Sequence, residues 1–246
     1  MSKVLVLIPS RMSAKRLHGK PLLEINNIPI ISHVFNRGIE TKLGEVFVCA
    51  EDQEIIAAVE KNNGKAILTG TQHKNGTERI YEGLQKLKIK DISHVISLQG
   101  DEPAINPEDI KILCSFMLKY NSEIGTLGAE IKEDSILNNE NIVKVITDKK
   151  LNNDNFVKAI NFSRKILSKD IKNIYHHIGV YCYKVSILEK FVNLKPTKNE
   201  LNNRLEQLRA IDNNIKIDVA LASSSPIGVD TEEDYLALKK IMEYKS

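Results

Sequence analysis

The sequence VLVLIPSRMSAKRLHGK, residues 4–20, decides the fold of this chain. Its first five residues are apolar, and Pro9 ends the apolar run. The segment that follows has no acidic residue and carries four cations, which are Arg11, Lys15, Arg16 and Lys20. The pattern predicts a buried strand that leads into a cationic loop. In α/β proteins the loop after the first strand lies at the carboxyl edge of the sheet, where ligands bind, and several cations on one short loop favour a triphosphate.

The rest of the first half alternates helical and strand patterns. Apolar spacing predicts helices at about 29–41, 53–61, 76–87 and 107–120, and strands at 45–50, 66–68 and 94–98. Such alternation predicts a parallel-rich sheet with helices on both faces. In the second half we expect strands at 124–131, 142–147, 157–161, 178–183 and 215–222, and helices at 200–211 and 231–244. Thr231 is expected to be the N-cap of the last helix, and residues 165–173 are expected to be irregular.

Length and composition limit the class of protein. The chain has 246 residues, 42% of them hydrophobic and 27% charged, which predicts one α/β domain over residues 1–246. A formal net charge of +3 is too small to indicate nucleic-acid binding, and no apolar run approaches the length of a membrane span. Cys49, Cys114 and Cys182 lie far apart and lack metal-type spacing, so we expect buried free thiols in a reducing cytoplasm.

The cation loop, residues 11–20, is the first candidate binding element. Arg offers phosphate oxygens a planar fork of donors, Lys offers a point charge, and Gly19 permits close backbone approach. The alternative is a solvated basic loop. The loop lacks the Walker pattern, and no Gly-x-Gly-x-x-Gly follows the first strand. An ordinary P-loop ATPase and a Rossmann dehydrogenase are therefore both disfavoured.

Two aspartates are candidate metal ligands. Asp101 follows a predicted strand and Gly100, which permits a sharp turn, so its carboxylate emerges at the carboxyl edge of the sheet. Asp230 immediately precedes a predicted helix. Mg²⁺ uses few protein oxygens and leaves its other positions to water and phosphates, so two carboxylates beside a cation loop suit metal-assisted phosphoryl chemistry. The alternatives are a turn built from Gly-Asp-x-Pro and an ordinary helix cap.

Other polar residues are less specific by themselves. The segment Gly76-Thr77-Glu78-Arg79 begins a predicted helix, where free N–H groups suit a nucleobase or a phosphate, although composition alone favours a simple cap. For Arg164, His177 and Arg209, taken one at a time, a structural role is the favoured interpretation. The sequence has no metal-type His/Cys cluster.

Taken together, these segments resemble the 3-deoxy-manno-octulosonate cytidylyltransferases, also called CMP-Kdo synthetases. The family's opening motif is similar to IPSRMSAKRLHGKPL at residues 8–22, and this motif alone is shared with related sugar nucleotidyltransferases. The later family motifs occur in family order over nearly the whole chain. They are similar to GTER at 76–79, QGDEP at 99–103, FSR at 162–164, HIGVY at 177–181, LEQLR at 205–209 and VDTEED at 229–234.

The resemblance implies a reaction and a fold. The reaction is the transfer of CMP from CTP to 3-deoxy-D-manno-octulosonate (Kdo), giving CMP-Kdo and pyrophosphate for lipopolysaccharide biosynthesis. The fold is a three-layer α/β/α arrangement with a mostly parallel mixed sheet, the Rossmann-like nucleotide-diphospho-sugar transferase fold. The family also implies Mg²⁺ and a homodimer, while the net charge and the lack of a long apolar run predict no nucleic-acid or membrane partner. About 1–120 would be the nucleotide-binding half, and about 121–246 the sugar-binding and dimerisation half.

The resemblance also assigns roles to residues. Arg11, Arg16 and Lys20 would hold the triphosphate and, with Asp101 and Asp230 as Mg²⁺ ligands, form the catalytic set. The residues that would line the cytidine pocket are Pro9, Ser10, Gly76, Thr77 and Arg79. Those that would face the sugar acid are Gln99, Arg164, His177, Tyr181, Glu206 and Gln207, with Arg164 as a partner for its carboxylate. We expect direct in-line attack by the sugar hydroxyl and no protein nucleophile.

Several positions depart from the family pattern. Lys15 replaces a small hydroxyl residue, and Glu51 replaces a Thr before Asp52. Three further departures fall in the second half and are Asn161, Lys165 with the two residues after it, and Asn203. A related acid sugar, such as amino-Kdo or a sialic-acid-like acid, is therefore an alternative substrate. A non-catalytic nucleotide-binding protein is a second alternative, disfavoured because both carboxylates and the cation loop are present.

Overall fold

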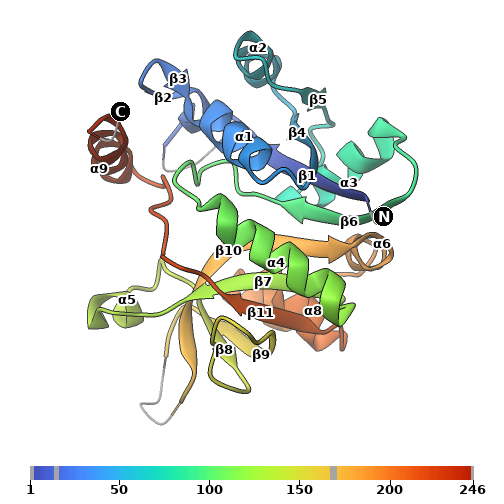
Figure 1. Ribbon diagram of the computed structural model, residues 1–246, viewed down its shortest axis with the longest axis vertical. Coiled ribbons are helices and arrows are strands. Elements are labelled where there is room, and N and C mark those ends of the chain that lie inside the picture. The colour runs from blue at the N-terminus through green and yellow to red at the C-terminus, as the bar shows by residue number, and fades with distance from the viewer. Residues whose placement is uncertain (1–2, 14–16, 167–170, 245–246) are drawn as a thin grey trace. The chain divides into compact units, whose positions relative to one another are not determined.

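A computed structural model describes residues 3–13, 17–166 and 171–244 of the chain (Figure 1). The chain forms two compact units. The first unit comprises Met1–Pro107 and Pro226–Ser246, and the second comprises Glu108–Ser225. The C-terminal segment thus returns to the first unit. The single-domain organisation stays a prediction.

The first unit contains parallel strands in the order β5-β4-β1-β6. Their bounds are Lys3–Ser10 for β1, Gly44–Ala50 for β4, Ala66–Leu68 for β5 and Ile92–Ser97 for β6. β1 lies between β4 and β6, and its residues from Val4 to Ile8 are buried. A strand with neighbours on both sides and helices on both faces must be apolar throughout, which accounts for the unbroken apolar run.

Helices cover both faces of these strands. They are α1 (Ile30–Glu40), α2 (Gln53–Lys61) and α3 (Gly76–Leu87). Gly38 of α1 packs onto Val6 and Val46, whereas Gly83 of α3 packs onto Cys49, which lies three positions after Val46 on β4 and so on the opposite face of the strand. Because successive strand residues point to opposite faces, α1 and α3 lie on opposite sides of the sheet.

The remaining elements of the first unit are small or come from its C-terminal segment. They are the 3-10 helix η1 (Lys20–Leu22), the short strands β2 (Glu24–Ile25) and β3 (Ile28–Pro29), and helix α9 (Glu232–Glu243). Leu238 of α9 packs in a buried cluster with Ile25, Ile30 and Val229. This cluster fixes the C-terminal segment beside β2 and β3. Thr231 is the N-cap of α9, as predicted.

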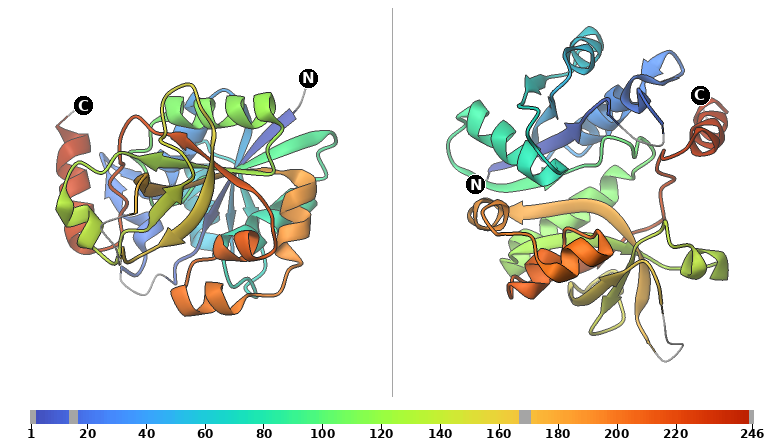
Figure 2. Two further views of the ribbon diagram at one scale, coloured as in Figure 1. Left: turned by 90° about the horizontal axis from the view of Figure 1, so that it is seen from below. Right: turned by 180° about the vertical axis from the view of Figure 1, so that it is seen from behind.

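The strands of the second unit form a closed circuit of pairings. Figure 2 shows the ribbon from two further sides. The order is β10-β7-β11-β9-β8, and β8 pairs with β10 as well. β7 and β11 pair parallel, and the other pairings of the circuit are antiparallel. The strand bounds are Ile124–Ala129 for β7, Lys144–Thr147 for β8, Val157–Ser163 for β9, Ile174–Lys184 for β10 and Ile217–Leu221 for β11. The predicted mixed sheet is thus parallel in the first unit and mixed in the second.

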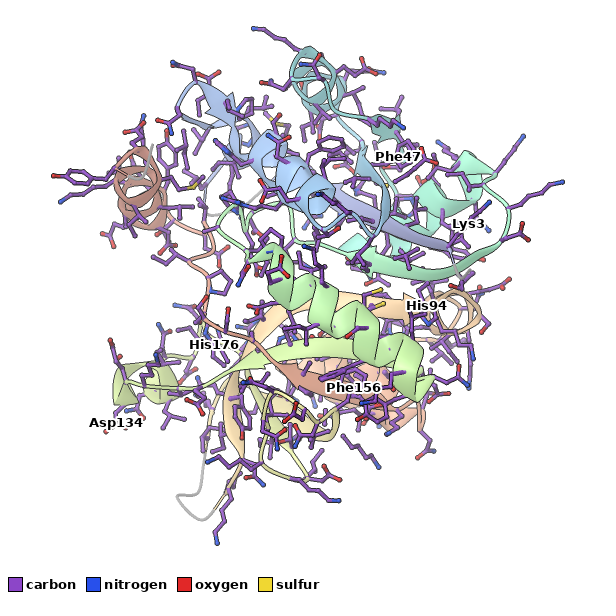
Figure 3. The ribbon with its side chains drawn as sticks, viewed as in Figure 1. Lys3, Phe47, His94, Asp134, Phe156 and His176 are labelled. Carbon is purple, nitrogen blue, oxygen red and sulfur yellow. The ribbon has the colours of Figure 1, made fainter. Side chains whose placement is uncertain are left out.

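The helices of the second unit are α4 (Pro107–Tyr120), α5 (Asp134–Asn138), α6 (Val185–Val192), α7 (Lys198–Asn203) and α8 (Leu208–Asp212). On α4, Phe116 contacts the ring of Phe156, with ring centroids 5.7 Å apart. Figure 3 labels Phe156. Within the described residues, no helix is both long and apolar enough to traverse a bilayer.

The single helix predicted at 200–211 is wrong. The chain instead forms α7 and α8, because Arg204 adopts a left-handed conformation with φ 53° and ends α7. The break lets Arg209 of α8 pair with Glu200 of α7, and both side chains are buried. Apolar periodicity does not reveal this fold-back, because it is stabilised by a buried ion pair. Most other predicted elements agree with the structure to within a few residues, although the strand predicted at 178–183 begins earlier, at Ile174.

Candidate active site

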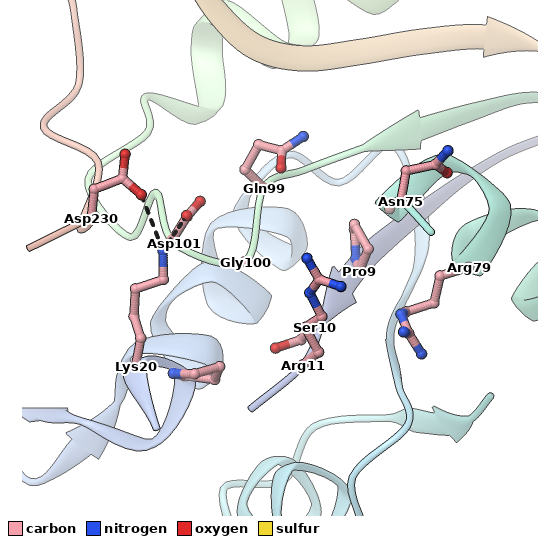
Figure 4. A pocket seen from close by; sticks show the side chains of 12 residues that line it. Pro9, Ser10, Arg11, Lys20, Asn75, Arg79, Gln99, Gly100, Asp101 and Asp230 are labelled. Atoms are coloured by element: carbon pink, nitrogen blue, oxygen red, sulfur yellow. Dashed lines mark hydrogen bonds and ion pairs between the residues drawn. The ribbon is translucent and has the colours of Figure 1, made fainter. Parts of the chain in front are cut away.

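The first unit contains a cavity of about 460 Å³ at the carboxyl ends of β1 and β6 (Figure 4). This volume is typical of small-molecule sites. The residues that line the cavity are Pro9, Ser10, Arg11, Lys20, Pro21, Asn75, Gly76, Arg79, Gln99, Gly100, Asp101 and Asp230. They come from five separate stretches of sequence, which are 9–11, 20–21, 75–79, 99–101 and residue 230. The sheet edge predicted to bind an anion is therefore hollow and lined by charged side chains.

Most residues predicted to bind the nucleotide lie in this cavity. Those that line it are Pro9, Ser10, Arg11, Lys20, Gly76 and Arg79. Thr77 is buried and is not among the lining residues, and Arg16 falls outside the described residues. Gln99, which was predicted to face the sugar acid, lines the same cavity.

Two glycines allow the lining segments to approach each other. A Cβ on Gly100 would lie 2.9 Å from the Pro9 carbonyl oxygen, and a Cβ on Gly76 would lie 2.9 Å from Pro9 Cγ. Both distances are shorter than a side chain tolerates, so glycine is required for this approach. The Leu98 amide donates to the Leu7 carbonyl at 3.1 Å and continues the strand pairing to the point where the turn begins.

The cation loop is tied to the neighbouring strand–helix connection. The Met12 amide donates to Asp52 Oδ2 at 2.8 Å. Asp52 is the N-cap residue of α2, but its side chain makes no capping hydrogen bond there. Its carboxylate therefore holds the start of the loop instead. At the other end, Gly19 adopts φ +71° and leads into η1, so that Lys20 faces the cavity.

Asp101 and Asp230 meet at Lys20, although they are distant in sequence. The Val229 amide donates to the Asp101 carbonyl at 2.9 Å, which joins the two segments directly. Lys20 Nζ lies 2.5 Å from Asp101 Oδ2 and 3.5 Å from Asp230 Oδ1 (Figure 4). The Asp230 amide donates to Asp234 Oδ2 at 3.1 Å, so the capping box of α9 also orients Asp230.

The donor set suits an ion that draws few ligands from the protein. Among the described residues, no group of three or more His, Cys, Asp and Glu side chains could hold a metal ion. Mg²⁺ is commonly bound by one or two carboxylates together with phosphates and water, and Asp101 and Asp230 fit that pattern. Ser10, in the wall of the same cavity, has a buried Oγ that finds no hydrogen-bond partner among the described residues. A ligand oxygen could satisfy this hydroxyl, since buried polar atoms are normally paired.

Arg79 forms another part of the wall. Its guanidinium donates to Thr69 Oγ1 at 2.7 Å and to the Gly70 carbonyl at 3.1 Å, and it pairs with the Glu51 carboxylate. The residue is only 2% exposed. Glu51 therefore compensates a buried charge that would otherwise be costly. With its charge compensated, Arg79 suits a base or ribose contact better than a phosphate contact.

The loop before α3 is held by Glu82. Its carboxylate accepts hydrogen bonds from the Gly70 amide at 2.9 Å and from the His73 ring, and it pairs with Lys86 at 2.7 Å. Burial by itself would raise the pKa of Glu82, but the hydrogen bonds from Lys86, His73 and Gly70 outweigh it and lower the pKa from 4.5 to about 2. The ionised carboxylate therefore anchors the loop that carries Asn75.

Three of the residues predicted to face the sugar acid lie together in the second unit. Tyr181, Glu206 and Gln207 line a smaller cavity of about 40 Å³. Its other lining residues are Ile124, Tyr183, Phe191, Ala210 and Ile217. Arg164 does not line this cavity. Its Nη1 donates to the carbonyls of Glu140 and Asn141 at 3.2 and 3.1 Å.

His177 lies beneath these residues in a buried, neutral state. Its ring contacts those of Phe162 and Tyr181, with centroids 5.0 and 5.5 Å away. Thr126 Oγ1 donates to the Val180 carbonyl at 2.8 Å, which leaves its oxygen to accept from His177 Nε2 at 3.0 Å. Burial and the neighbouring His176 lower the pKa of His177 from 6.5 to about 3.

Tyr181 also remains uncharged at neutral pH. Burial raises the pKa of its phenol well above the ordinary value, and nearby Tyr183 and Glu206 add to the effect. His177 and Tyr181 can therefore supply hydrogen bonds and shape, but not charge, at neutral pH.

Sequence reasoning missed Asn75 and Pro21, which both line the larger cavity. Asn75 is the N-cap of α3, and its Oδ1 accepts from the Glu78 amide at 2.8 Å. The signal for Asn75 was present, because Asn directly before the start of a helix is a preferred cap. Pro21 follows Lys20 in the first motif, but nothing in the pattern separates a lining proline from a structural one.

The parallel sheet, the cation loop at its carboxyl edge and the paired aspartates define a nucleotidyltransferase, and comparison with known proteins narrows the class. Residues 5–217 match the family model described as Cytidylyltransferase. The chain belongs to this family and, within it, to the 3-deoxy-manno-octulosonate cytidylyltransferases. The resemblance drawn from the sequence motifs is thereby confirmed.

Individual relatives match over nearly their full length. The chain is 41% identical to the 3-deoxy-manno-octulosonate cytidylyltransferase of Afipia carboxidovorans, over 97% of this chain and 96% of that protein. It is 42% identical to the protein of the same name from Thermodesulfovibrio yellowstonii, over 96% of each. A solved structure of CMP:2-keto-3-deoxy-manno-octonic acid synthetase complexed with CTP is 31% identical and superposes with a TM-score of 0.89, covering 100% of both chains. The predicted nucleotide-diphospho-sugar transferase fold is confirmed.

Proposed function

We propose that this chain transfers CMP from CTP to the anomeric hydroxyl of Kdo and releases pyrophosphate, a step of lipopolysaccharide biosynthesis. The observation that carries the proposal is the convergence of Asp101, Asp230 and Lys20 in one cavity at the sheet edge. This arrangement occurs in a chain about 40% identical, over nearly its full length, to proteins that bear the name of this activity.

The cavity would offer separate surfaces to the parts of CTP. Arg11 and Lys20, together with Arg16 of the cation loop, would neutralise the triphosphate. Gly76, Arg79 and Pro9 would contact the cytidine, and the unpaired Ser10 hydroxyl would donate to a ligand oxygen. Thr77 stays a predicted member of this set.

Asp101 and Asp230 would hold Mg²⁺ beside the phosphates. When bound, the ion would neutralise charge on the triphosphate and its leaving pyrophosphate. The protein's own contribution is to fix the two carboxylates and the cations relative to the α-phosphorus, so that the sugar hydroxyl attacks in line as pyrophosphate leaves. The chemistry needs no covalent bond to the protein.

The sugar acid would be held by hydrogen bonds and one cation. Tyr181, Glu206 and Gln207 line one cavity, and His177 packs beneath Tyr181. Arg164 is the candidate partner of the sugar carboxylate, although in the structure its guanidinium caps backbone carbonyls. Binding the carboxylate therefore requires that the Arg164 side chain use its remaining donors or change its partners.

A pyrophosphate-release assay tests the proposal. Each of the four nucleoside triphosphates is combined with Kdo, amino-Kdo and N-acetylneuraminate in the presence of Mg²⁺. We expect release only with CTP, and most rapidly with Kdo. Faster release with another acid would instead identify the related-sugar alternative. CTP binding with no pyrophosphate release for any acid would favour a non-catalytic protein.

Replacing one of the two candidate metal carboxylates tests their role in turnover. Asp101→Asn removes a charge but keeps the shape of the side chain, and it should reduce turnover at least about a hundredfold while leaving the unfolding temperature near that of the wild type. Unchanged turnover at saturating Mg²⁺ would argue against the metal role.

The expected homodimer and cytoplasmic location belong to the same proposal, and light scattering of the purified chain tests the dimer.

A further inference from the structure

Lys20 occupies the space between the two candidate metal ligands. Its Nζ is 2.5 Å from Asp101 Oδ2 and 3.5 Å from Asp230 Oδ1, and its side chain is only 11% exposed (Figure 4). Two carboxylates that face the same small volume repel each other. The ammonium between them offsets that repulsion and holds both side chains in place.

The backbone at Lys20 is held by local contacts. Gly19 enters η1 in a left-handed conformation, the Leu22 amide donates to the Gly19 carbonyl at 2.9 Å, and Pro21 is buried. The lysine side chain is a flexible four-carbon chain that carries a point charge. Its charged end can therefore exchange one anionic partner for another without any change in the loop.

We infer, on the basis of the proposed metal-binding role of Asp101 and Asp230, that Lys20 is a positioning residue that holds the place of the divalent cation. Mg²⁺ bonds to oxygen at about 2.0–2.1 Å, so a metal shared by these two carboxylates would need the space that the ammonium occupies. The ammonium must leave before the metal binds to both acids. The triphosphate offers the departing ammonium a new anionic partner in the same cavity.

Lys20 thereby couples two binding events. Nucleotide draws the ammonium away and vacates the metal position, and metal binding releases the ammonium for the phosphates. Each ligand favours the state that the other requires, which is positive coupling between them. Without nucleotide, the enzyme should bind a divalent cation weakly despite its two converging carboxylates.

The test measures metal binding in the absence of nucleotide and sugar. Mn²⁺ is titrated into the full-length protein and free Mn²⁺ is followed by electron paramagnetic resonance. Lys20→Met keeps the length of the side chain and removes its charge, so it should tighten Mn²⁺ binding by about tenfold. Lys20→Gln is a second uncharged variant in case the first is unstable, and Lys20→Arg, which keeps the charge, should remain close to the wild type.

Arg11→Met is the matched control. Arg11 is another cation that lines the same cavity, so its removal changes the local charge equally. It should alter Mn²⁺ affinity by less than about twofold if the contact between Lys20 and the acids is what matters. An equal gain in both variants would reduce the effect to general electrostatics and overturn the inference. Mn²⁺ binding to Lys20→Met and Lys20→Gln that is no tighter than in the wild type would overturn it too.

A double variant separates this inference from the proposed function. In Lys20→Met/Asp101→Asn the gain should disappear, since the carboxylate that benefits from removal of the ammonium is missing. If the gain persists, the metal binds elsewhere and the assignment of Asp101 fails. Pyrophosphate release does not enter this measurement, so the transfer activity can fail its own test independently.

Discussion

The pair formed by Arg79 and Glu51 shows how one residue change is accommodated in the cavity wall. Arg79 is almost fully buried, and Glu51 supplies the carboxylate that compensates its charge. Glu51 stands where the family resemblance leads us to expect a Thr, which has no charge. In this chain, therefore, Arg79 is held by an ion pair in addition to its bonds to Thr69 and Gly70.

Replacing Glu51 by Gln should destabilise the fold and weaken CTP binding. A buried Arg that loses its charge partner costs about 3–5 kcal/mol in the unfolding free energy, and the retained amide oxygen should lower this to about 2 kcal/mol. Denaturant unfolding and the KM for CTP measure the two effects. Glu45→Gln is the control, because the Glu45–Lys65 pair is more than half exposed on both sides and should contribute almost nothing. Equal losses in both variants would contradict a specific role for Glu51.

His177 gives stability a predictable dependence on pH. The pKa of its ring is about 3 in the folded chain against an ordinary value of 6.5. Between these values the unfolded chain binds more protons, so this residue's contribution is complete above about pH 6.5 and is lost as pH falls toward 3, with a slope of at most about 1.4 kcal/mol per pH unit. His177→Gln should reduce the slope of the unfolding free energy against pH in this range by up to about 1.4 kcal/mol per pH unit, which corresponds to one proton. An unaltered slope would mean that the ring is protonated in the native state.

Among the elements, the turn after β6 depends on close backbone contact. Gly100 follows β6 closely and precedes Asp101, and it lies against the last residues of β1. An added Cβ would meet the Pro9 carbonyl oxygen at 2.9 Å, and a backbone atom cannot rotate away as a side chain can. The position of Asp101 thus depends on how closely two elements approach each other.

Gly100→Ala should lower kcat/KM by at least about tenfold, because a displacement of a few tenths of an ångström at Asp101 misaligns the catalytic set. Steady-state pyrophosphate release measures the change. Gly228→Ala is the matched control, since its Cβ would find its nearest atoms at 3.8 and 4.0 Å, which is ordinary contact. A comparable loss in both variants would show that the tight contact at Gly100 is not the cause.

At the scale of the whole molecule, the two compact units carry different sets of candidate residues. The cavity with the cations and the aspartates belongs to the first unit, and the cavity with Tyr181, Glu206 and Gln207 belongs to the second. If the residues of the first unit bind CTP and those of the second bind the sugar acid, substitutions in each unit should raise the KM for a different substrate.

Arg164→Ala in the second unit should raise the KM for Kdo about tenfold or more and leave the KM for CTP within about twofold, because a charge-assisted contact to the sugar carboxylate would be lost. Arg11→Ala in the first unit should show the reverse pattern. Initial rates with each substrate varied in turn measure both constants. A selective rise in the KM for CTP on changing Arg164 would show that this residue is misplaced in the sugar site.

The sequence alone determined the parts that rest on local pattern. The apolar run of β1, helices α1 to α4, the cap at Thr231 and the family motifs are read from periodicity, capping preference and spacing, because each depends on residues close together in the chain. Only the tertiary structure decided which distant charges meet. The pair of Arg79 with Glu51 and the position of Lys20 between Asp101 and Asp230 arise from contacts between segments that are remote in sequence, and spacing along the chain carries no information about such contacts. The break at Arg204 is local, but it depends on the burial of the pair of Arg209 with Glu200, which apolar periodicity does not reveal.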